Sequence, residues 1–183
     1  ASVRLGVGCL VRMQISQTSE QIAALAAFQR HCEIQGITLE SCTASRAKAG
    51  TAFKEPFSVK PSLSNISSSF QGPQFIVEVS FQYEAWDSSE PEERVFVVNC
   101  TFEVVYSVTD DYTPTEEEKS SFCKGTALFN CWPYAREFLR EITARLGHQT
   151  PVLPLLRISP KKGSLTEPTQ VSSPTELPKL NAE

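Results

Sequence analysis

The chain has 183 residues, enough for one domain or one domain with tails, and its 40% apolar content suffices for a core. Its formal net charge is −4, from 17 basic and 21 acidic side chains, which argues against a basic face for nucleic acid. No apolar run reaches the ~20 residues of a membrane span. The six cysteines are dispersed and only two histidines are present, which argues against a zinc site and favours a reducing cytoplasm.

The first predicted element is a helix over residues 17–32. Its start, Thr18-Ser19-Glu20-Gln21, fits a capping box, in which the Thr18 hydroxyl accepts from a backbone amide and Gln21 reaches back. We interpret residues 1–31 as an N-terminal helical extension that packs on the body of the protein. The alternative is a dimerisation arm.

Two strands are predicted next. Residues 32–42 have strand character, with a bulge or bend expected at Gly36 because the apolar parity changes there. Residues 57–63 suggest a second strand, and Pro61 favours a position at a sheet edge. Residues 64–73 are rich in Ser and Asn and are predicted to form a loop.

The clearest pattern in the chain is a pair of long alternating segments. Residues 75–86 and 95–108 each place apolar side chains at every second position, and a short polar turn joins them. This pattern predicts an antiparallel hairpin with one buried face. The second segment also carries Val95, Val97 and Val105 on its other face, which indicates a second layer, a partner subunit or a ligand groove.

Two further helices are predicted. Thr113-Pro114-Thr115-Glu116 fits another capping box, with Pro114 at the first helical position, and this helix is expected to end at Gly125. The next helix is expected to begin at Pro133 and to end at Gly147, where a left-handed residue suits a helix terminus.

The remaining chain lacks helical periodicity. Residues 151–158 contain two prolines and several aliphatic residues, which predicts an extended strap on the body. Residues 159–183 are rich in Pro, Ser and Thr and are predicted to form a disordered tail. The element order therefore predicts an α+β fold: a four-stranded antiparallel sheet with two C-terminal helices on one side, plus the N-terminal helix.

Little in the sequence indicates catalysis. It shows no nucleophile–base set, no metal-ligand spacing and no Gly-rich phosphate loop, so we predict a protein that is not an enzyme and needs no cofactor. Cys123 and Cys131 could form a redox pair, but buried packing is favoured. Trp86 and Trp132 each fit ordinary packing. Together with the two-faced strand they indicate subunit contact or capture of an extended apolar peptide.

Three stretches carry a resemblance to a known family. They are Phe122-Cys123-Lys124-Gly125, Trp132-Pro133-Tyr134-Ala135-Arg136-Glu137 and the Pro- and Leu-rich residues 149–158. Together they resemble the C-terminal half of the SecB family of protein-export chaperones, and the similarity extends over residues 32–158. We therefore expect a SecB-like domain at 32–158. The specific part is Pro-Tyr-Ala-Arg-Glu.

The resemblance implies a cytoplasmic, ATP-independent holdase in protein export that binds unfolded or partly folded polypeptides in apolar grooves. It also implies a homo-oligomer assembled as a dimer of dimers. By similarity, Val98, Cys100 and Phe102 are expected at or behind the subunit contact. Val97 is expected to face clients, and strand parity and aromatic character add Phe57, Tyr83, Trp86 and Trp132 to the expected client-facing residues.

Some features differ from the family. The net charge is small, the tail carries Lys161 and Lys162, and the N-terminal helix is additional. These differences weaken the case for the SecA motor as a partner. One alternative is a dedicated SecB-like chaperone that protects an antitoxin. Another is a structural or scaffolding oligomer that binds no client. We expect neither nucleic-acid binding nor membrane insertion.

Overall fold

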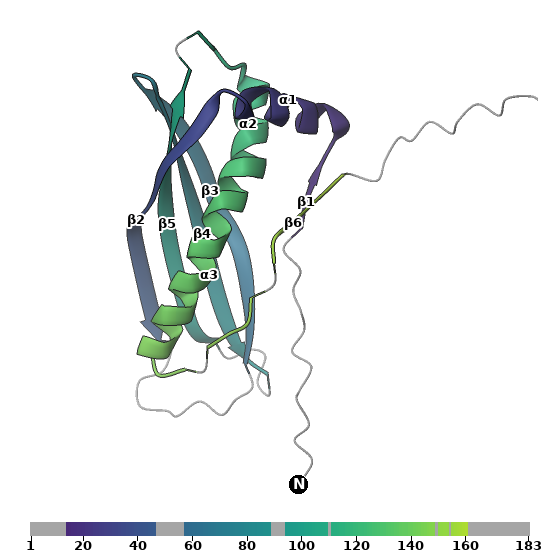
Figure 1. Ribbon diagram of the computed structural model, residues 1–183. Coiled ribbons are helices and arrows are strands. Elements are labelled where there is room, and N and C mark those ends of the chain that lie inside the picture. The colour runs from purple at the N-terminus through teal and green to yellow at the C-terminus, as the bar shows by residue number, and fades with distance from the viewer. Residues whose placement is uncertain are drawn as a thin grey trace, which may run out of the picture.

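The computed structural model describes residues 14–46, 57–88, 94–109, 111–148, 150–153 and 155–160. The elements in chain order are β1 (Gln14–Gln17), α1 (Ser19–Gln29), β2 (Cys32–Arg46), β3 (Phe57–Gln71), β4 (Gln74–Asp87), β5 (Arg94–Val108), α2 (Glu116–Phe122), the π-helical turn η1 (Cys123–Ala127), α3 (Leu128–Arg145) and β6 (Arg157–Pro160). The four long strands form a sheet behind α3, and α1 crosses its upper end (Figure 1). The predicted α+β fold is confirmed. Residues 1–13 and residues 161–183 of the predicted tail lie outside the described ranges, whereas its first two residues, Ser159 and Pro160, belong to β6.

The sheet has the strand order β2-β5-β4-β3, and every neighbouring pair is antiparallel. β2 and β3 are therefore edge strands, as Pro61 indicated for β3. The bulge predicted at Gly36 is confirmed by a register shift between Ile34 and Gly36. A second shift, between Leu39 and Ser41, was not predicted.

The predicted loop over residues 64–73 is wrong, because β3 continues to Gln71. Two apolar side chains explain the continuation, since Ile66 pairs with Val79 and Phe70 with Phe75 on the inner face of the sheet. The turn that follows is shorter than expected and contains Gly72, whose φ of 59° suits glycine.

The inner face of the sheet, which α3 covers, holds the core. Phe81 lies 5.8 Å from Trp132, and Phe102 lies 6.3 Å from Phe138, measured between ring centroids. These contacts place the middle of α3 over β4 and β5. The alternation predicted for these two strands is confirmed by their burial patterns.

α2, η1 and α3 follow one another without an intervening loop, and two predicted boundaries are therefore wrong. Gly125 lies inside the helical run, where glycine makes room for α1, because a Cβ atom there would approach Leu25 Cδ1 to 2.1 Å. Pro133 lies inside α3, because buried Leu128, Cys131 and Trp132 extend the apolar stripe on its N-terminal side. The predicted helix end is confirmed at Gly147, which has a φ of 80°.

The predicted capping box of α1 is confirmed: Thr18 Oγ1 accepts from the Gln21 amide, and Gln21 Oε1 accepts from the Thr18 amide. The second box lies two residues later than predicted, because both positions match the same sequence pattern. Thr115 caps α2, and its amide donates to Glu118 Oε2 at 2.7 Å. Tyr112 favours this position, since its hydroxyl donates to the same carboxylate.

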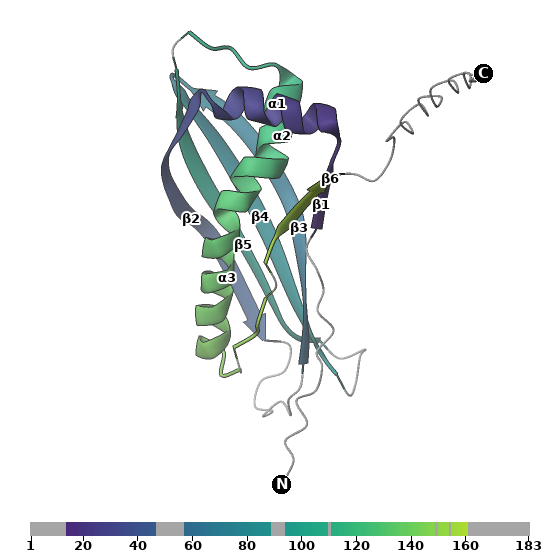
Figure 2. The same ribbon diagram turned by 45° about the vertical axis from the view of Figure 1, so that its right-hand side comes forward.

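The segment after α3 is extended, as predicted for the strap. It runs back beside α3 toward β6, which pairs in parallel with β1 (Figure 2). Leu153 and Leu156 are each only 6% exposed and belong to the hydrophobic core. The strap therefore contributes buried side chains to the core of the fold.

Candidate functional site

The two faces of the sheet differ in chemistry. The outer face, away from α3, carries mostly Ser, Thr, Asn, Gln and Glu, several of which form hydrogen bonds between neighbouring strands. Examples are Ser80 with Thr101 at 2.9 Å and Ser67 with Glu78 at 2.9 Å. A polar, hydrogen-bonded face offers little apolar area to a ligand, so the candidate site lies on the inner face.

On the inner face, α3 leaves an apolar strip beside β2 uncovered. We name this strip the open flank, and it consists of Ile34, Ile37, Leu39 and Cys42 of β2, Phe138 of α3, whose ring contacts Phe102 of β5, and Tyr134 one helical turn before Phe138. The β2 residues lie opposite Tyr106, Val104, Phe102 and Cys100 of β5, whose side chains are buried in the core. The β2 members therefore point to the same face as that core.

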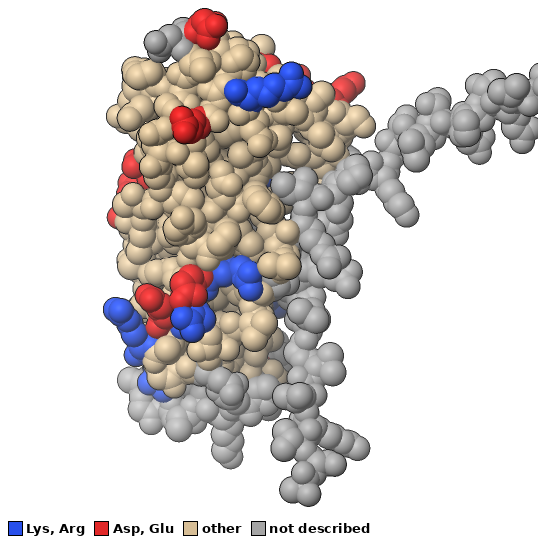
Figure 3. All heavy atoms as spheres, viewed as in Figure 1, with Lys and Arg blue, Asp and Glu red and all other residues tan. Residues whose placement is uncertain are grey.

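The open flank is accessible to solvent. Ile34 is 45% exposed, Leu39 is 38% exposed and Tyr134 is 51% exposed. Figure 3 shows the middle of this side of the molecule largely uncharged, with Lys, Arg, Asp and Glu gathered near its upper and lower ends and its edges. Large apolar side chains grouped on an uncharged face are typical of an interaction surface.

The open flank adjoins an unpaired strand edge. β2 has fifteen residues and pairs with β5 on one side only among the described strands. An unpaired edge offers backbone N–H and C=O groups to an added strand. An extended peptide could therefore gain main-chain hydrogen bonds from β2 and apolar contacts from the open flank.

The other side of α3 is closed by the chain itself. We name it the covered flank: here strap residues 150–153 line a hollow with Pro133, Arg136 and Arg140 of α3, and Leu153 and Leu156 fill the core. A remaining hollow of about 480 Å³ lies between β3, β1 and the start of α3, with Ile15, Leu63 and Leu128 among its lining residues.

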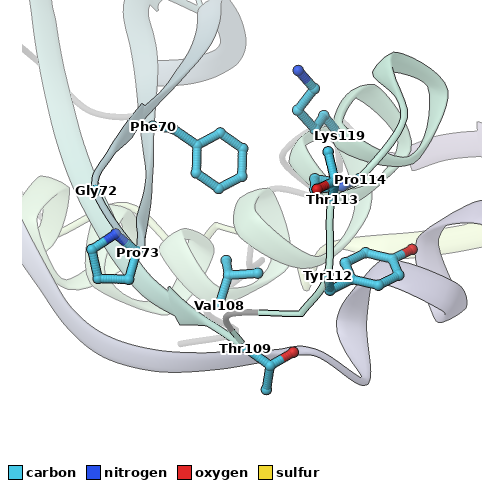
Figure 4. Close-up of a pocket in the computed structure, with 9 residues that line it drawn as sticks. All are labelled: Phe70, Gly72, Pro73, Val108, Thr109, Tyr112, Thr113, Pro114 and Lys119. Atoms are coloured by element: carbon cyan, nitrogen blue, oxygen red, sulfur yellow. The ribbon is translucent and has the colours of Figure 1, made fainter.

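A further pocket of about 530 Å³ lies at the end of the sheet, between the β3–β4 turn and the segment that leads into α2 (Figure 4). Phe70, Pro73 and Val108 line it from the sheet, and Pro114 and Lys119 line it from the helix side. Below it, the Tyr112 ring stacks on His31 at 3.8 Å. Polar and apolar side chains line the pocket in similar measure, and it contains no pair of groups suited to acid–base chemistry.

The structure does not bring the five predicted client-facing residues together. Tyr83 is 0% exposed and Trp132 is 3% exposed, and both lie in the core between the sheet and α3. Phe57 is half-buried on the inner face, where its ring lies 5.7 Å from Phe96. Trp86 and Val97 lie on the outer face. Their contact with clients stays a prediction, and the two core residues could join it only if α3 moved.

Trp86 has a distinct environment on the outer face. The Arg94 guanidinium lies 5.0 Å from its ring centre, and Arg94 also pairs with Glu84 at 3.1 Å. Lys60 lies 6.0 Å from the same ring. The indole is thus surrounded by charged groups rather than by an apolar groove.

The three predicted interface residues, Val98, Cys100 and Phe102, are buried on the inner face of β5. Phe102 contacts Phe138 of α3, so part of this burial arises within one chain. They lie directly behind the open flank, opposite Ala44, Cys42 and Leu39 of β2. Their role in assembly stays a prediction.

No catalytic centre emerges from the described residues. They contain no cluster of three or more His, Cys, Asp or Glu side chains that could hold a metal ion. Burial raises the pKa of Cys131 to about 12, and it also raises the pKa of Cys123, which opposes thiolate formation at both. Within the same ranges, no helix combines the length and apolar character needed to cross a bilayer.

Sequence reasoning missed the β2 members of the open flank. Ile34, Leu39 and Cys42 do not follow one alternating pattern, because the two bulges change the parity twice. No feature of composition or spacing in the sequence signalled the second shift, at Glu40. Tyr134 was quoted only as part of the family motif.

No protein-family model matches the chain. No curated protein matches it either. Among solved structures, it is similar to the Mycobacterium tuberculosis Rv1957 SecB-like chaperone, solved in complex with a ChAD peptide from the Rv1956 HigA1 antitoxin. The TM-score is 0.65 at 19% sequence identity, over 75% of this chain and 99% of that one. The fold is therefore SecB-like.

A second similar structure is a protein of unknown function from Streptococcus agalactiae. It has a TM-score of 0.40 and 12% identity, over 68% of this chain and 97% of that one. This likeness is too distant to support an argument about the site.

Proposed function

We propose that this chain is an ATP-independent chaperone that holds unfolded or partly folded polypeptides on the open flank. The observation that carries the proposal is a row of exposed aliphatic and aromatic side chains beside an unpaired strand edge. The SecB-like fold supports it, because the similar chaperone from M. tuberculosis was solved with a bound peptide.

The proposed binding needs only apolar contact and backbone hydrogen bonds, both of which this surface offers. A holdase must accept many sequences, so it gains affinity from apolar area and from backbone pairing rather than from reading individual side chains. Burial of apolar area contributes about 25 cal/mol per Å² before the costs of ordering a chain. Several moderate contacts along β2 would therefore produce reversible binding.

The client class remains part of the proposal. Precursor proteins in cytoplasmic protein export, with SecA as a partner, are the clients that the SecB resemblance implies. A second candidate is a dedicated chaperone of an antitoxin, and the peptide in the M. tuberculosis complex favours it. We further propose a homo-oligomer, a dimer of dimers, since the edge of β3 could be extended by a second copy without competing with a client for β2.

The test is whether the purified protein keeps a urea-diluted, aggregation-prone polypeptide in a soluble complex, measured by size exclusion with light scattering. Leu39→Asp should weaken capture at least about tenfold, because a charge on the open flank loses apolar contact and carries a desolvation cost. Ser41→Asp is the matched control: it adds the same charge two residues away, on the outer face.

Three outcomes separate the candidates. Loss of capture in Leu39→Asp alone supports the open flank as the client surface. Equal loss in both variants would point to the strand edge or net charge instead. An oligomer that captures no polypeptide would overturn the chaperone proposal and favour scaffolding. Comparing an export precursor with an isolated antitoxin as the polypeptide separates the two client classes.

A further inference from the structure

Cys42 and Cys100 stand directly opposite each other across the β2–β5 pair. Residues opposite each other in an antiparallel pair have Cα atoms about 4.5–5.5 Å apart, and disulfides form at Cα separations of about 4.4–6.8 Å. Both cysteines carry free thiols. We infer that Cys42 and Cys100 form a reversible cross-strand disulfide, a thiol-modification site that ties the edge strand β2 to the centre of the sheet.

The register that creates this pair depends on the second bulge of β2. Leu39 lies opposite Phe102, so a regular strand would place Ser41 opposite Cys100. The extra residue, Glu40, shifts the register by one position and brings Cys42 there instead. The Cys42 thiol therefore lies on the inner face of the sheet, as does the thiol of Cys100.

The two thiols have different access to solvent. Cys42 is exposed on the open flank, whereas Cys100 is buried. Burial, with a further contribution from the nearby Cys42, raises the pKa of Cys100 to about 12. Cys42 is therefore the thiol that meets an oxidant first. Cys100 reacts second, and its raised pKa, which opposes thiolate formation, makes this second step the slower one.

The oxidant required is a disulfide of the glutathione type. The Cys42 thiolate attacks one sulfur of that disulfide, which forms a mixed disulfide and releases one glutathione thiolate. Cys100, after losing its proton, then attacks the Cys42 sulfur and releases the second glutathione. Two protein thiols are oxidised, one small disulfide is reduced to two thiols, and the protein loses two hydrogen atoms.

The edge position of β2 makes the closure feasible. Opposite Cβ atoms lie about 4.5–5.5 Å apart in a sheet, whereas a disulfide needs about 3.5–4.5 Å, so the strands must move closer by roughly 1 Å. Among the described strands β2 pairs with β5 alone, and its residues from Thr38 to Arg46 are exposed, so few contacts oppose this movement.

The test uses the native, fully reduced chain treated with glutathione disulfide, followed by alkylation of the remaining thiols and mass spectrometry of peptides. The expected result is a linked peptide pair containing Cys42 and Cys100, reversed by dithiothreitol. On a non-reducing gel the product should migrate as a single chain. Cys42→Ser, at an exposed position, should abolish the link, and Cys32→Ser should leave it intact as a matched control on the same strand.

Three results would overturn the inference: Cys42 retained as its glutathione adduct with Cys100 still reduced, a Cys100–Cys131 bond, or a bond only between two chains. None of these readouts requires a client, so failure here is separate from failure of the proposed chaperone function. A consequence that does rest on that function is a difference in capture between oxidised and reduced protein. It should be absent in Cys42→Ser.

Discussion

On either side of α3 the sheet presents aliphatic side chains from an edge strand to the same helix, but only one side is closed by the chain itself. On the covered flank, the strap brings Leu153 and Leu156 into the core and ends in the β1–β6 pair. On the open flank, Ile34 and Leu39 have no comparable cover among the described residues. The same sheet and helix thus produce one surface for stability and one suited to binding.

The difference follows from chain connectivity. After Gly147 the chain turns back along the β3 side, so its apolar residues close that flank. Nothing in the described ranges returns along β2, which begins directly after α1 and leaves the sheet at Arg46. Apolar side chains left open beside an edge strand are available to a second polypeptide.

The largest expected effect is on stability, from a truncation on the covered flank. Leu153→Ala removes a buried side chain and should lower the free energy of unfolding by about 2–4 kcal/mol. Leu155→Ala, two residues along the strap and 69% exposed, should change it by less than about 0.5 kcal/mol. Urea unfolding followed by circular dichroism measures both. Equal effects would mean that the strap does not pack as described.

The next effect concerns the close approach of α1 to the helical run. Gly125→Val should destabilise the fold by about 1–3 kcal/mol, because the Cβ position lies 2.1 Å from Leu25 Cδ1. Valine is a better helix former than glycine, so a loss would report the steric contact. Gly36→Val is the control, since a Cβ there meets nothing within 4 Å. A thermal unfolding series would contradict this contact if the two variants behaved alike.

A smaller stability effect is expected on the open flank. Leu39→Ala should cost less than about 1 kcal/mol, because the side chain is already partly exposed in the native state. The Leu39→Ala variant should nevertheless bind less anilinonaphthalene sulfonate dye, measured by fluorescence, than the Ser41→Ala variant, whose change lies on the outer face. A large loss of stability with unchanged dye binding would show that this flank is part of the core.

The sequence alone predicted the sheet and both long central strands, because their alternation is regular and needs no tertiary information. It also predicted the α1 cap, the Gly36 bulge and the strap. It failed where tertiary packing overrides a local signal. Gly125 and Pro133 each predicted a helix boundary, yet both lie within one continuous helical run, where Gly125 is close to α1 and buried residues of α3 pack on the sheet. The prediction of the site failed for another reason. The bulge at Glu40 changes which residues face α3, and no composition or spacing reports that shift.

The smallest expected effect concerns the hydrogen bonds that Glu118 accepts from Thr115 and Tyr112 at the start of α2. The pKa of Glu118 is lowered, first by the Thr115 amide and then by the Tyr112 hydroxyl, both of which donate to its carboxylate. A lowered pKa means that the folded state favours the ionised group. Its stabilising contribution is therefore present above the ordinary carboxyl pKa of about 4.3 and is lost as the pH falls through the folded-state value.

Glu118→Gln should lower the midpoint of thermal unfolding slightly at neutral pH, and the difference from the native sequence should vanish in acid. The Glu118 side chain is only partly buried, so solvent screening keeps the effect well below ~1 kcal/mol. Glu117→Gln, in the same helical turn, controls for the loss of one negative charge near the helix start. If both variants showed the same pH profile, the helix dipole rather than the contacts with Thr115 and Tyr112 would account for the effect, and α2 would lack a specific polar anchor there.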